Sequence, residues 1–191
     1  MSTTKSTPSI KGTKTEQNLV NAFIAESQAY TRYTYYADKA KKEGYFPIQK
    51  IFEDTAANEL RHGKVYMKFL QGGTVPCNIA VDAVNIQDTA ANLEIAIHEE
   101  STEGYEVYLA NAKVAEEEGL IEIAEHFRSI ASIEEHHMKR FQKCLEHVKN
   151  GTLWKREKPI KWECLVCGYI YEGTEPPKTC PACDHPYQHY M

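Results

Sequence analysis

Apolar positions recur every three or four residues over four long stretches of this chain, 15–43, 46–71, 89–118 and 120–149. This spacing is typical of amphipathic α-helices, and the glycines that follow the stretches are typical helix stops. Each stretch is longer than an average globular helix, which favours a bundle in which the helices support one another. The pattern therefore predicts an all-α four-helix bundle.

The connections predict how these helices are joined. Short turns at Gly44 and Gly119 separate the members of each pair, whereas about 17 residues link the second helix to the third, enough to run the length of the bundle. We therefore expect a ferritin-like bundle over 15–150 with one long crossover. The predicted remainder is a flexible N-terminus over 1–14, a charged linker over 151–161 and a small domain over 162–191.

The two helix pairs repeat each other. A shift of 75 positions, the separation of Gly44 and Gly119, also aligns "NELRH" with "IEEHH". The preceding helices align with a slip of one residue, in "ESQAYTRY" and "ESTEGYEVY", which pairs Glu26 with Glu100. This internal duplication predicts a two-fold-like arrangement of the bundle.

Ionisable residues interrupt the inward apolar stripe of every helix near its middle. Stepping alternately three and four residues gives stripes that are apolar at both ends and leave Glu99, Glu135 and His136 outside. On the first helix the stripe includes Tyr30 and Tyr33. On the third helix it continues through Val107, Ala110 and Val114. The ionisable residues on the stripes are Glu26, Glu59, His62, Glu100, Glu103, Glu134 and His137.

These ionisable residues predict a metal site. The rise of about 1.5 Å per residue brings them into one layer, where uncompensated buried charge would cost several kcal/mol. A single Glu-x-x-His is readily explained as a surface pair, but two in register, with Glu26 and Glu100 on the other helices, form the ligand set of di-iron and di-manganese bundles. One imidazole per metal suits iron or manganese better than zinc or copper.

Glu103 breaks the symmetry of this ligand set. In the first half its place is taken by Ala29 or Gln28. Glu103 could simply form hydrogen bonds within the site. Alternatively, because ferric iron favours an anionic oxygen and ferrous iron accepts neutral imidazole, Glu103 and His62 would exchange as the oxidation state changes.

Two CxxC pairs near the C-terminus predict a second metal site. Four thiolates on two short turns form a tetrahedral S4 site for zinc or iron. Zinc would hold together a segment too small for its own core, whereas iron would act as a one-electron relay. A di-iron site that reduces peroxide needs such a relay, which favours iron. The ligands are Cys164, Cys167, Cys180 and Cys183, and the expected aromatic core is Trp162, Tyr169 and Tyr171.

Composition narrows the possible functions. With 27 acidic and 22 basic residues and a formal charge of -5, the chain is a poor general nucleic-acid binder. It has no apolar run of the roughly 20 residues that a membrane span needs and no signal-peptide pattern, so we expect a cytoplasmic protein. Cys77 and Cys144 are expected to be reduced thiols.

These motifs, "AESQAYTRY", "NELRH", "EESTEGY", "IEEHH" and both CxxC pairs, resemble those of the rubrerythrin family over about 15–190. The resemblance implies a ferritin-like di-iron domain followed by a rubredoxin-like Fe(Cys)4 domain. It implies that His62 replaces Glu103 at one reduced iron, and that Tyr33 and Tyr108 lie beside the irons. The implied di-iron ligands are Glu26, Glu59, Glu100, Glu103, Glu134 and His137.

The resemblance also implies an activity. The family reduces hydrogen peroxide to water in protection against oxidative stress, with electrons from NAD(P)H that arrive through carriers such as a rubredoxin and its reductase. It further implies a homodimer in which the tail of one subunit serves the di-iron site of the other.

Two other functions stay open. A ferritin-like ferroxidase or iron-storage protein would share the carboxylate site but has no evident use for a thiolate relay. A zinc-ribbon interaction module fused to a metal-binding bundle would have a colourless tail.

Overall fold

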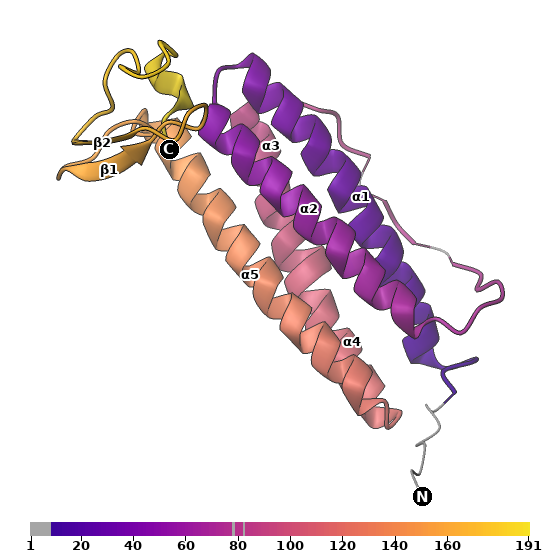
Figure 1. The fold of residues 1–191 in the computed structure, drawn as a ribbon. Coiled ribbons are helices and arrows are strands. Elements are labelled where there is room, and N and C mark those ends of the chain that lie inside the picture. The colour runs from indigo at the N-terminus through magenta and orange to yellow at the C-terminus, as the bar shows by residue number, and fades with distance from the viewer. Residues whose placement is uncertain (1–8, 78, 82) are drawn as a thin grey trace, which may run out of the picture.

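The computed structural model describes residues 9–77, 79–81 and 83–191 and forms a four-helix bundle with a small C-terminal domain (Figure 1). The bundle elements are α1 (Lys14–Lys42), α2 (Phe46–Phe69), α3 (Thr89–Glu99), the π-helix η1 (Glu100–Glu106), α4 (Val107–Glu117) and α5 (Ile121–Asn150). The tail contains β1 (Ile160–Glu163), β2 (Ile170–Gly173) and the 3-10 helix η2 (Tyr187–His189). The predicted fold class is confirmed.

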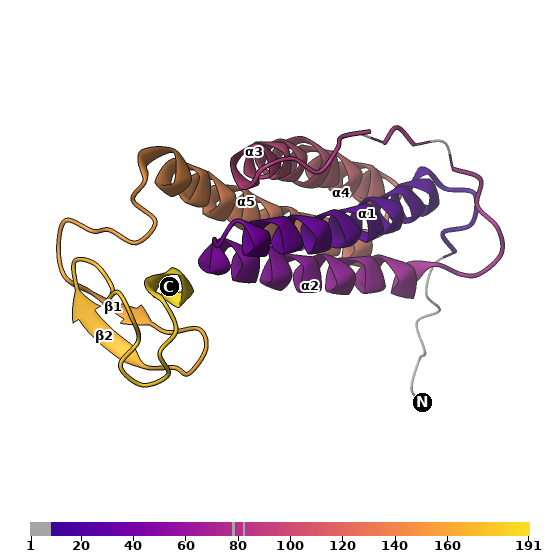
Figure 2. The same cartoon turned by 90° about the horizontal axis from the view of Figure 1, so that it is seen from above.

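The helices form two hairpins that lie side by side. Figures 1 and 2 show α1 beside α2, and the continuous α3–η1–α4 rod beside α5. The segment between α2 and α3 returns along α1, where Val84 and Ile86 line a groove with Phe23 and Tyr36. This is the predicted long crossover. Residues 1–8 of the expected flexible N-terminus lie outside the described residues, and Ile10 is buried.

The turns within the two hairpins are near copies of each other. Gly44 and Gly119 have φ values of 79° and 76°, which favour glycine because a side chain is strained there. In each turn the next residue closes the helix end: the N–H of Tyr45 bonds to the Ala40 carbonyl at 2.9 Å, and that of Leu120 to the Ala115 carbonyl at 2.8 Å. The duplication therefore extends to the backbone.

Each hairpin also caps the other. Glu43, at the end of α1, accepts hydrogen bonds from the backbone N–H and the hydroxyl of Thr89 at 2.9 and 2.6 Å. Its repeat, Glu118, accepts from the N–H groups of Lys14 and Thr15, both at 2.9 Å. A carboxylate at a helix N-terminus satisfies free N–H groups and interacts favourably with the helix dipole. These reciprocal caps fix the lengthwise register of the hairpins.

The third predicted helix is not uniformly α-helical, because η1 forms seven residues of π-helix in its middle. A π-helical turn accommodates an extra residue, so it shifts the inward face of everything that follows. The predicted inward stripe of the third helix was therefore wrong after η1, since Val107 and Ala110 are exposed. The residues buried instead are Tyr108, Asn111, Ala112 and Ala115. The one-residue slip between the repeats marks this insertion in the sequence.

Two apolar clusters lie on either side of the ionisable layer. One contains Leu19, Tyr66 and Phe127, and the other contains Phe52 and Phe141. This arrangement follows the predicted stripes, which are apolar at both ends. Tyr30 was placed inward wrongly: it is 38% exposed.

The tail is a two-stranded hairpin that packs against the start of α2. The ring of His189 stacks on Phe46 with centroids 3.7 Å apart, and Trp154 stacks on Tyr45. Its core consists of Trp162, Cys164, Cys180 and Tyr190. The expectation for Tyr169 and Tyr171 was wrong, since both are more than a third exposed. The buried places beside the sulfurs are taken by Trp162 and Tyr190.

Among the described residues, no helix is both long enough and apolar enough to cross a membrane.

Gly104, within η1, allows α5 to approach closely. A Cβ at this position would lie 2.9 Å from Cγ and 3.0 Å from Cβ of Glu134. We expect Gly104→Ala to lower the free energy of unfolding by about 1–3 kcal/mol, because one of these groups must move. Urea unfolding followed by circular dichroism measures this, with Ser101→Ala in the same helix as the control. Equal stability of the two variants would contradict the steric role of Gly104.

Candidate metal centres

The ionisable residues of the four helices meet in two overlapping groups at the middle of the bundle. In each group the potential ligand atoms lie within 4.8 Å of one another. Glu59 of α2 and Glu134 of α5 belong to both groups, so both are placed to bridge two metal ions. One group is Glu26, Glu59, His62 and Glu134, and the other is Glu59, Glu100, Glu134 and His137.

The layer obeys the two-fold symmetry that the duplication predicts. Nδ1 of His62 lies 2.9 Å from Glu59 and 3.0 Å from Glu134. Nδ1 of His137 lies 2.8 Å from Glu134 and 3.1 Å from Glu59. Each imidazole therefore directs Nδ1 at the carboxylate of its own helix and at that of the facing helix. The i, i+3 spacing of Glu-x-x-His produces this geometry, because residues three apart share a helix face.

Tyr33 and Tyr108 complete the layer by exchanging hydrogen bonds between the hairpins. The Tyr33 hydroxyl donates to Oε1 of Glu100, and the Tyr108 hydroxyl donates to Oε1 of Glu26, both at 2.7 Å. All four side chains are buried. Each tyrosine thus binds Oε1 of one glutamate, Glu100 or Glu26, and orients its carboxylate. Oε2 of the same glutamate lies toward an imidazole.

The donor set fits metal ions. Both oxygens of Glu59 and of Glu134, and Nδ1 of both histidines, are buried without a hydrogen bond of good geometry. Buried polar atoms are normally satisfied, so this cluster of lone pairs requires a cation. Iron and manganese accept such oxygen-rich sets with one imidazole per metal.

Without a metal, protons compensate the charge of the layer. Burial disfavours the His62 imidazolium, but the close carboxylates of Glu134, Glu26 and Glu59 outweigh burial and raise its pKa to about 12. The pKa of His137 rises to about 11 in the same way. Burial raises the pKa of Glu26 to about 8. These are the protons that metal ions would displace.

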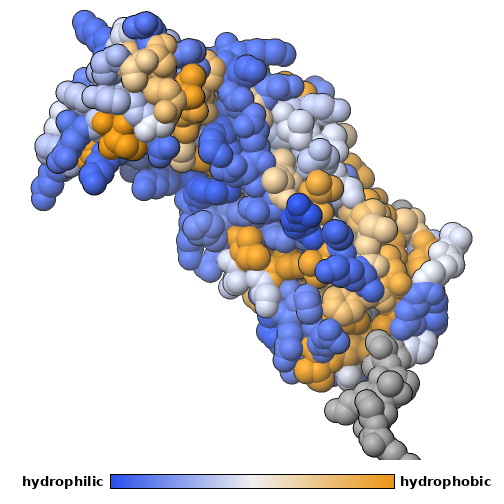
Figure 3. Space-filling model, in the orientation of Figure 1, coloured by the Kyte–Doolittle hydropathy of each residue, from blue (hydrophilic) through white to orange (hydrophobic). Residues whose placement is uncertain are grey.

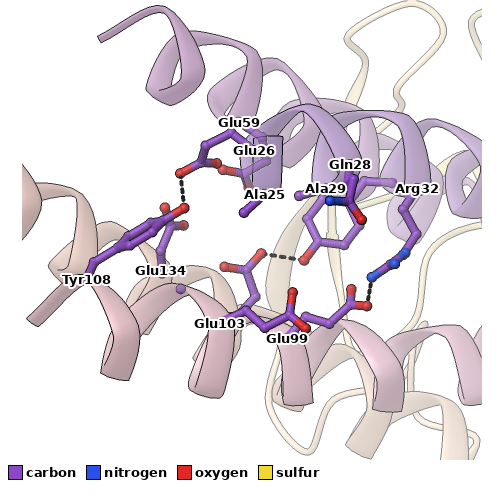
Figure 4. Close-up of a pocket in the computed structure, with 13 residues that line it drawn as sticks. Ala25, Glu26, Gln28, Ala29, Arg32, Glu59, Glu99, Glu103, Tyr108 and Glu134 are labelled. Atoms are coloured by element: carbon purple, nitrogen blue, oxygen red, sulfur yellow. Dashed lines mark hydrogen bonds and ion pairs between the residues drawn. The ribbon is translucent and has the colours of Figure 1, made fainter. Parts of the chain in front are cut away.

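Glu103 stands apart from the two groups. It lies on η1, is exposed, and lines a cavity of about 30 Å³ that borders Glu26, Glu59 and Glu134. Glu103 and Glu99 lie across this cavity from Glu26 and Glu59 (Figure 4). The structure therefore gathers His62, and not Glu103, among the potential ligands.

The four cysteines of the tail are arranged for a tetrahedral metal. The Sγ–Sγ distances of Cys164–Cys183 and Cys167–Cys180 are both 3.7 Å, far from the roughly 2.05 Å of a disulfide. Bonds of about 2.3 Å to a central metal give tetrahedron edges of about 3.8 Å. The residues fit an Fe(Cys)4 centre.

Two similar turns create this geometry. Gly168 and Asp184 follow the second cysteine of each pair with φ values of 76° and 59°. Their N–H groups bond back to the carbonyls of Cys164 and Cys180 at 2.8 and 3.0 Å. Burial disfavours the Cys180 thiolate, but hydrogen bonds, including those from backbone N–H groups, outweigh burial and lower its pKa to about 6. A lowered pKa favours the form that binds metal.

The remaining cysteines lie outside both centres. Cys77 is exposed and Cys144 is buried, and both are free thiols. Burial raises the pKa of Cys144 to about 11.

Comparison with known proteins identifies the family. The rubrerythrin family profile matches residues 17–145 and, in a second match, 91–164, and the profile for the rubredoxin-like domain of rubrerythrin matches residues 162–191. The chain is 46% identical over 182 residues to the rubrerythrin of Nitratidesulfovibrio vulgaris, covering 95% of each chain. It is 44% identical to that of Porphyromonas gingivalis, covering 98% of this chain and 94% of the other.

The chain belongs to the rubrerythrin family.

Solved structures agree with this assignment. A mixed-valence nigerythrin superimposes with a TM-score of 0.62 and 25% identity, covering 100% of this chain and 99% of the other. A bacterioferritin of Desulfovibrio desulfuricans matches 72% of this chain and 81% of its own with a TM-score of 0.65; its 23% identity supports the ferritin-like fold alone.

The predicted rubrerythrin cofactors are confirmed as types of site. The tail has the clustered cysteines of a rubredoxin-like iron centre, and the bundle has buried carboxylates and imidazoles suited to a di-iron site. The assignment of each ligand to each metal stays a prediction.

An ion pair beside the rubrerythrin metal layer was missed by the sequence analysis. Glu99, which the sequence analysis left outside the inward stripe, is buried and forms an ion pair with Arg32 of α1 (Figure 4). Both residues line the cavity that Glu103 borders. Arg32 directly precedes Tyr33, and Glu99 directly precedes Glu100, so the pair joins α1 to the start of η1 beside the Tyr33–Glu100 hydrogen bond. Arg32 and Glu99 both lie outside the predicted stripes and on different helices, so no periodic pattern in the sequence indicates that they pair.

We expect Arg32→Met to lower the free energy of unfolding by about 3 kcal/mol, because it leaves the buried Glu99 carboxylate without its cation. Lys139→Met is the matched control. Its ion pair with Glu135 is exposed and should contribute less than about 1 kcal/mol. Denaturant unfolding of both variants tests the difference, and equal losses would show that burial of the Arg32 pair is unimportant.

Proposed function

We propose that this chain is a non-haem di-iron peroxidase that reduces hydrogen peroxide to water in protection against oxidative stress. The observation that carries the proposal is the presence, in one chain, of a buried site for two metal ions and a separate site for one thiolate-bound iron. Reduction of one peroxide to two waters consumes two electrons and two protons. When bound, the iron pair supplies Lewis acidity and two electrons, and the Fe(Cys)4 centre replaces those electrons singly.

The cavity beside the metal layer supports a small substrate. A water molecule needs roughly 10–15 Å³ of such space, so about 30 Å³ has room for roughly the two oxygen atoms of hydrogen peroxide. Its lining includes the bridging candidates Glu59 and Glu134, so a peroxide bound there would lie against the metal layer.

The side chains of the chain itself would position the site and move protons. Tyr33 and Tyr108 hold Glu100 and Glu26 by their hydroxyl groups, so these carboxylates keep one orientation. Glu103 is exposed and also lines the cavity, and a carboxylate so placed can carry protons from solvent to the departing oxygen. In the proposal Glu103 also takes the place of His62 at one metal when the site is oxidised.

The position of the tail supports electron transfer between subunits of a homodimer. The tail packs against Phe46, whereas Glu59 lies 13 residues further along α2, about 20 Å away along the helix axis. Apolar side chains are spread over the face of the bundle seen in Figure 3, and Leu60 and Met67 of α2 are both more than half exposed. In the proposed dimer this face is covered and the tail reaches the partner's metal layer.

The remaining parts of the proposal concern electron supply and location. Electrons would come from NAD(P)H through a rubredoxin or similar carrier and its reductase, to a cytoplasmic protein. Carrier-dependent oxidation of NAD(P)H on addition of peroxide tests this route. Iron uptake and mineral formation without such oxidation would instead identify a ferroxidase or storage protein.

We expect Cys164→Ser to leave the helices folded but to slow steady-state peroxide turnover sharply, because the relay loses one of its four sulfur ligands. Circular dichroism reports the helices, and visible absorption of the ferric thiolate reports the centre. Cys77→Ser is the matched control, since Cys77 is an exposed free thiol outside both centres. Unchanged turnover of Cys164→Ser with a protein electron donor would contradict the relay.

We also expect discrimination by substrate size. The value of kcat/KM for tert-butyl hydroperoxide should be at least about tenfold below that for hydrogen peroxide, a difference of about 1.4 kcal/mol in transition-state stabilisation. Gln28→Ala shortens a side chain that lines the cavity and so enlarges the cavity without changing the metal layer. This variant should reduce the difference between the kcat/KM values of the two peroxides. Equal values for both peroxides would show that this cavity does not receive the substrate.

A further inference from the structure

Because the metal layer is nearly two-fold symmetric, a contact that is made by one imidazole and not by the other distinguishes the two metal positions. The distances from each Nδ1 to the facing carboxylate agree within 0.1 Å, at 3.0 Å for His62 and 3.1 Å for His137. The two tyrosine hydrogen bonds have the same length. A contact present at only one imidazole therefore marks a real difference between the two metal positions.

Asn58 makes such a contact. Its Oδ1 lies 3.3 Å from Nε2 of His137, on the side of the ring opposite to the carboxylates. The shift of 75 positions that relates Glu59 to Glu134 places Ile133 where Asn58 stands, and an alkyl side chain cannot accept a hydrogen bond. Among the residues that the structure describes, none forms a hydrogen bond with Nε2 of His62.

This contact has a direct effect on a metal-binding imidazole. A histidine that binds metal through Nδ1 carries its proton on Nε2, and an acceptor there fixes the tautomer and the ring orientation and makes the ring more basic. His137 has this support and is 1% exposed, whereas His62 lacks it and is 6% exposed. The ring of His62 is therefore held only from its carboxylate side.

We propose that Asn58 is a positioning residue that anchors His137 to its metal, and that Ile133 leaves His62 unanchored. The difference at one repeat position determines which of the two equivalent imidazoles can leave its metal. Glu103 lines the cavity that borders both groups, through Glu26 of the group with His62 and Glu100 of the group with His137. The part of this inference that concerns exchange with Glu103 rests on the proposed function, but the difference in anchoring does not.

Reciprocal substitutions test the proposal on the full-length chain, stripped of metal and titrated with Co(II), whose visible absorption reports the ligand set. We expect Asn58→Ile to weaken one of the two binding steps 10- to 100-fold, the range for loss of an outer hydrogen bond to a metal ligand. Ile133→Asn should strengthen the other step, because it supplies His62 with an acceptor. Asn58→Asp, which keeps an acceptor oxygen, should restore the affinity.

If Asn58 had only a structural role, its substitution would lower the unfolding midpoint of the metal-free chain. The anchoring role predicts no such change. Both positions are exposed, so the unfolding midpoint of the metal-free chain should be the same for every variant. Binding by Asn58→Ile within twofold of the unsubstituted chain, or failure of Asn58→Asp to restore it, would overturn the proposal. If crystals of the oxidised, iron-loaded, unsubstituted chain show His62 released from its metal, those of Ile133→Asn should show it retained, and its release there too would overturn the proposal.

The same variants separate this inference from the proposed function. If the iron-loaded chain does not turn over peroxide but the Co(II) affinities shift as stated, the anchoring stands and the peroxidase fails. If turnover is present and the affinities do not shift, the peroxidase stands and the anchoring fails.

Discussion

Compensation of buried negative charge is the constraint on which the rest of this structure depends. Four glutamates lie in the middle of the bundle with less than 5% exposure, and among the described residues the only cationic groups inside the layer are two imidazoles. Such a layer is tolerable only if metal ions or protons balance it and if every remaining lone pair is held. The tyrosine hydrogen bonds, the apolar clusters on both sides and the reciprocal helix caps all serve to hold these carboxylates together in register.

The duplicated halves satisfy this constraint symmetrically. The departures from symmetry are the features that make the two metal positions different from each other. The π-helix η1 inserts one residue in the second half only and carries Glu103 to the cavity. In the described part of the chain, the Arg32–Glu99 ion pair and the Asn58–His137 contact likewise have no counterpart in the other half of the repeat. A strictly symmetric site would treat both metals alike. These features give the two metal positions different surroundings and put the open side of the layer at η1.

The tail adds a site of a different kind, in which thiolates on two tight turns suit an iron that changes charge by one electron. The tail lies at one end of the bundle (Figure 1), and the metal layer lies at its middle. The packing of Phe46 on His189 fixes the tail at that end. The separation explains why the proposed transfer of electrons joins two subunits instead of the two sites of one chain.

The sequence alone determined the four helices, the crossover, the types of both metal sites and the family, because periodicity, glycine stops and i, i+3 pairs are local consequences of helix geometry. It placed Val107 and Ala110 inward wrongly, since a uniform 3.6-residue period cannot represent a π-helical insertion. The tertiary structure alone decided the partners of Arg32 and Asn58. Both contacts join residues of different hairpins, and such pairings depend on how the hairpins dock, which no local pattern records.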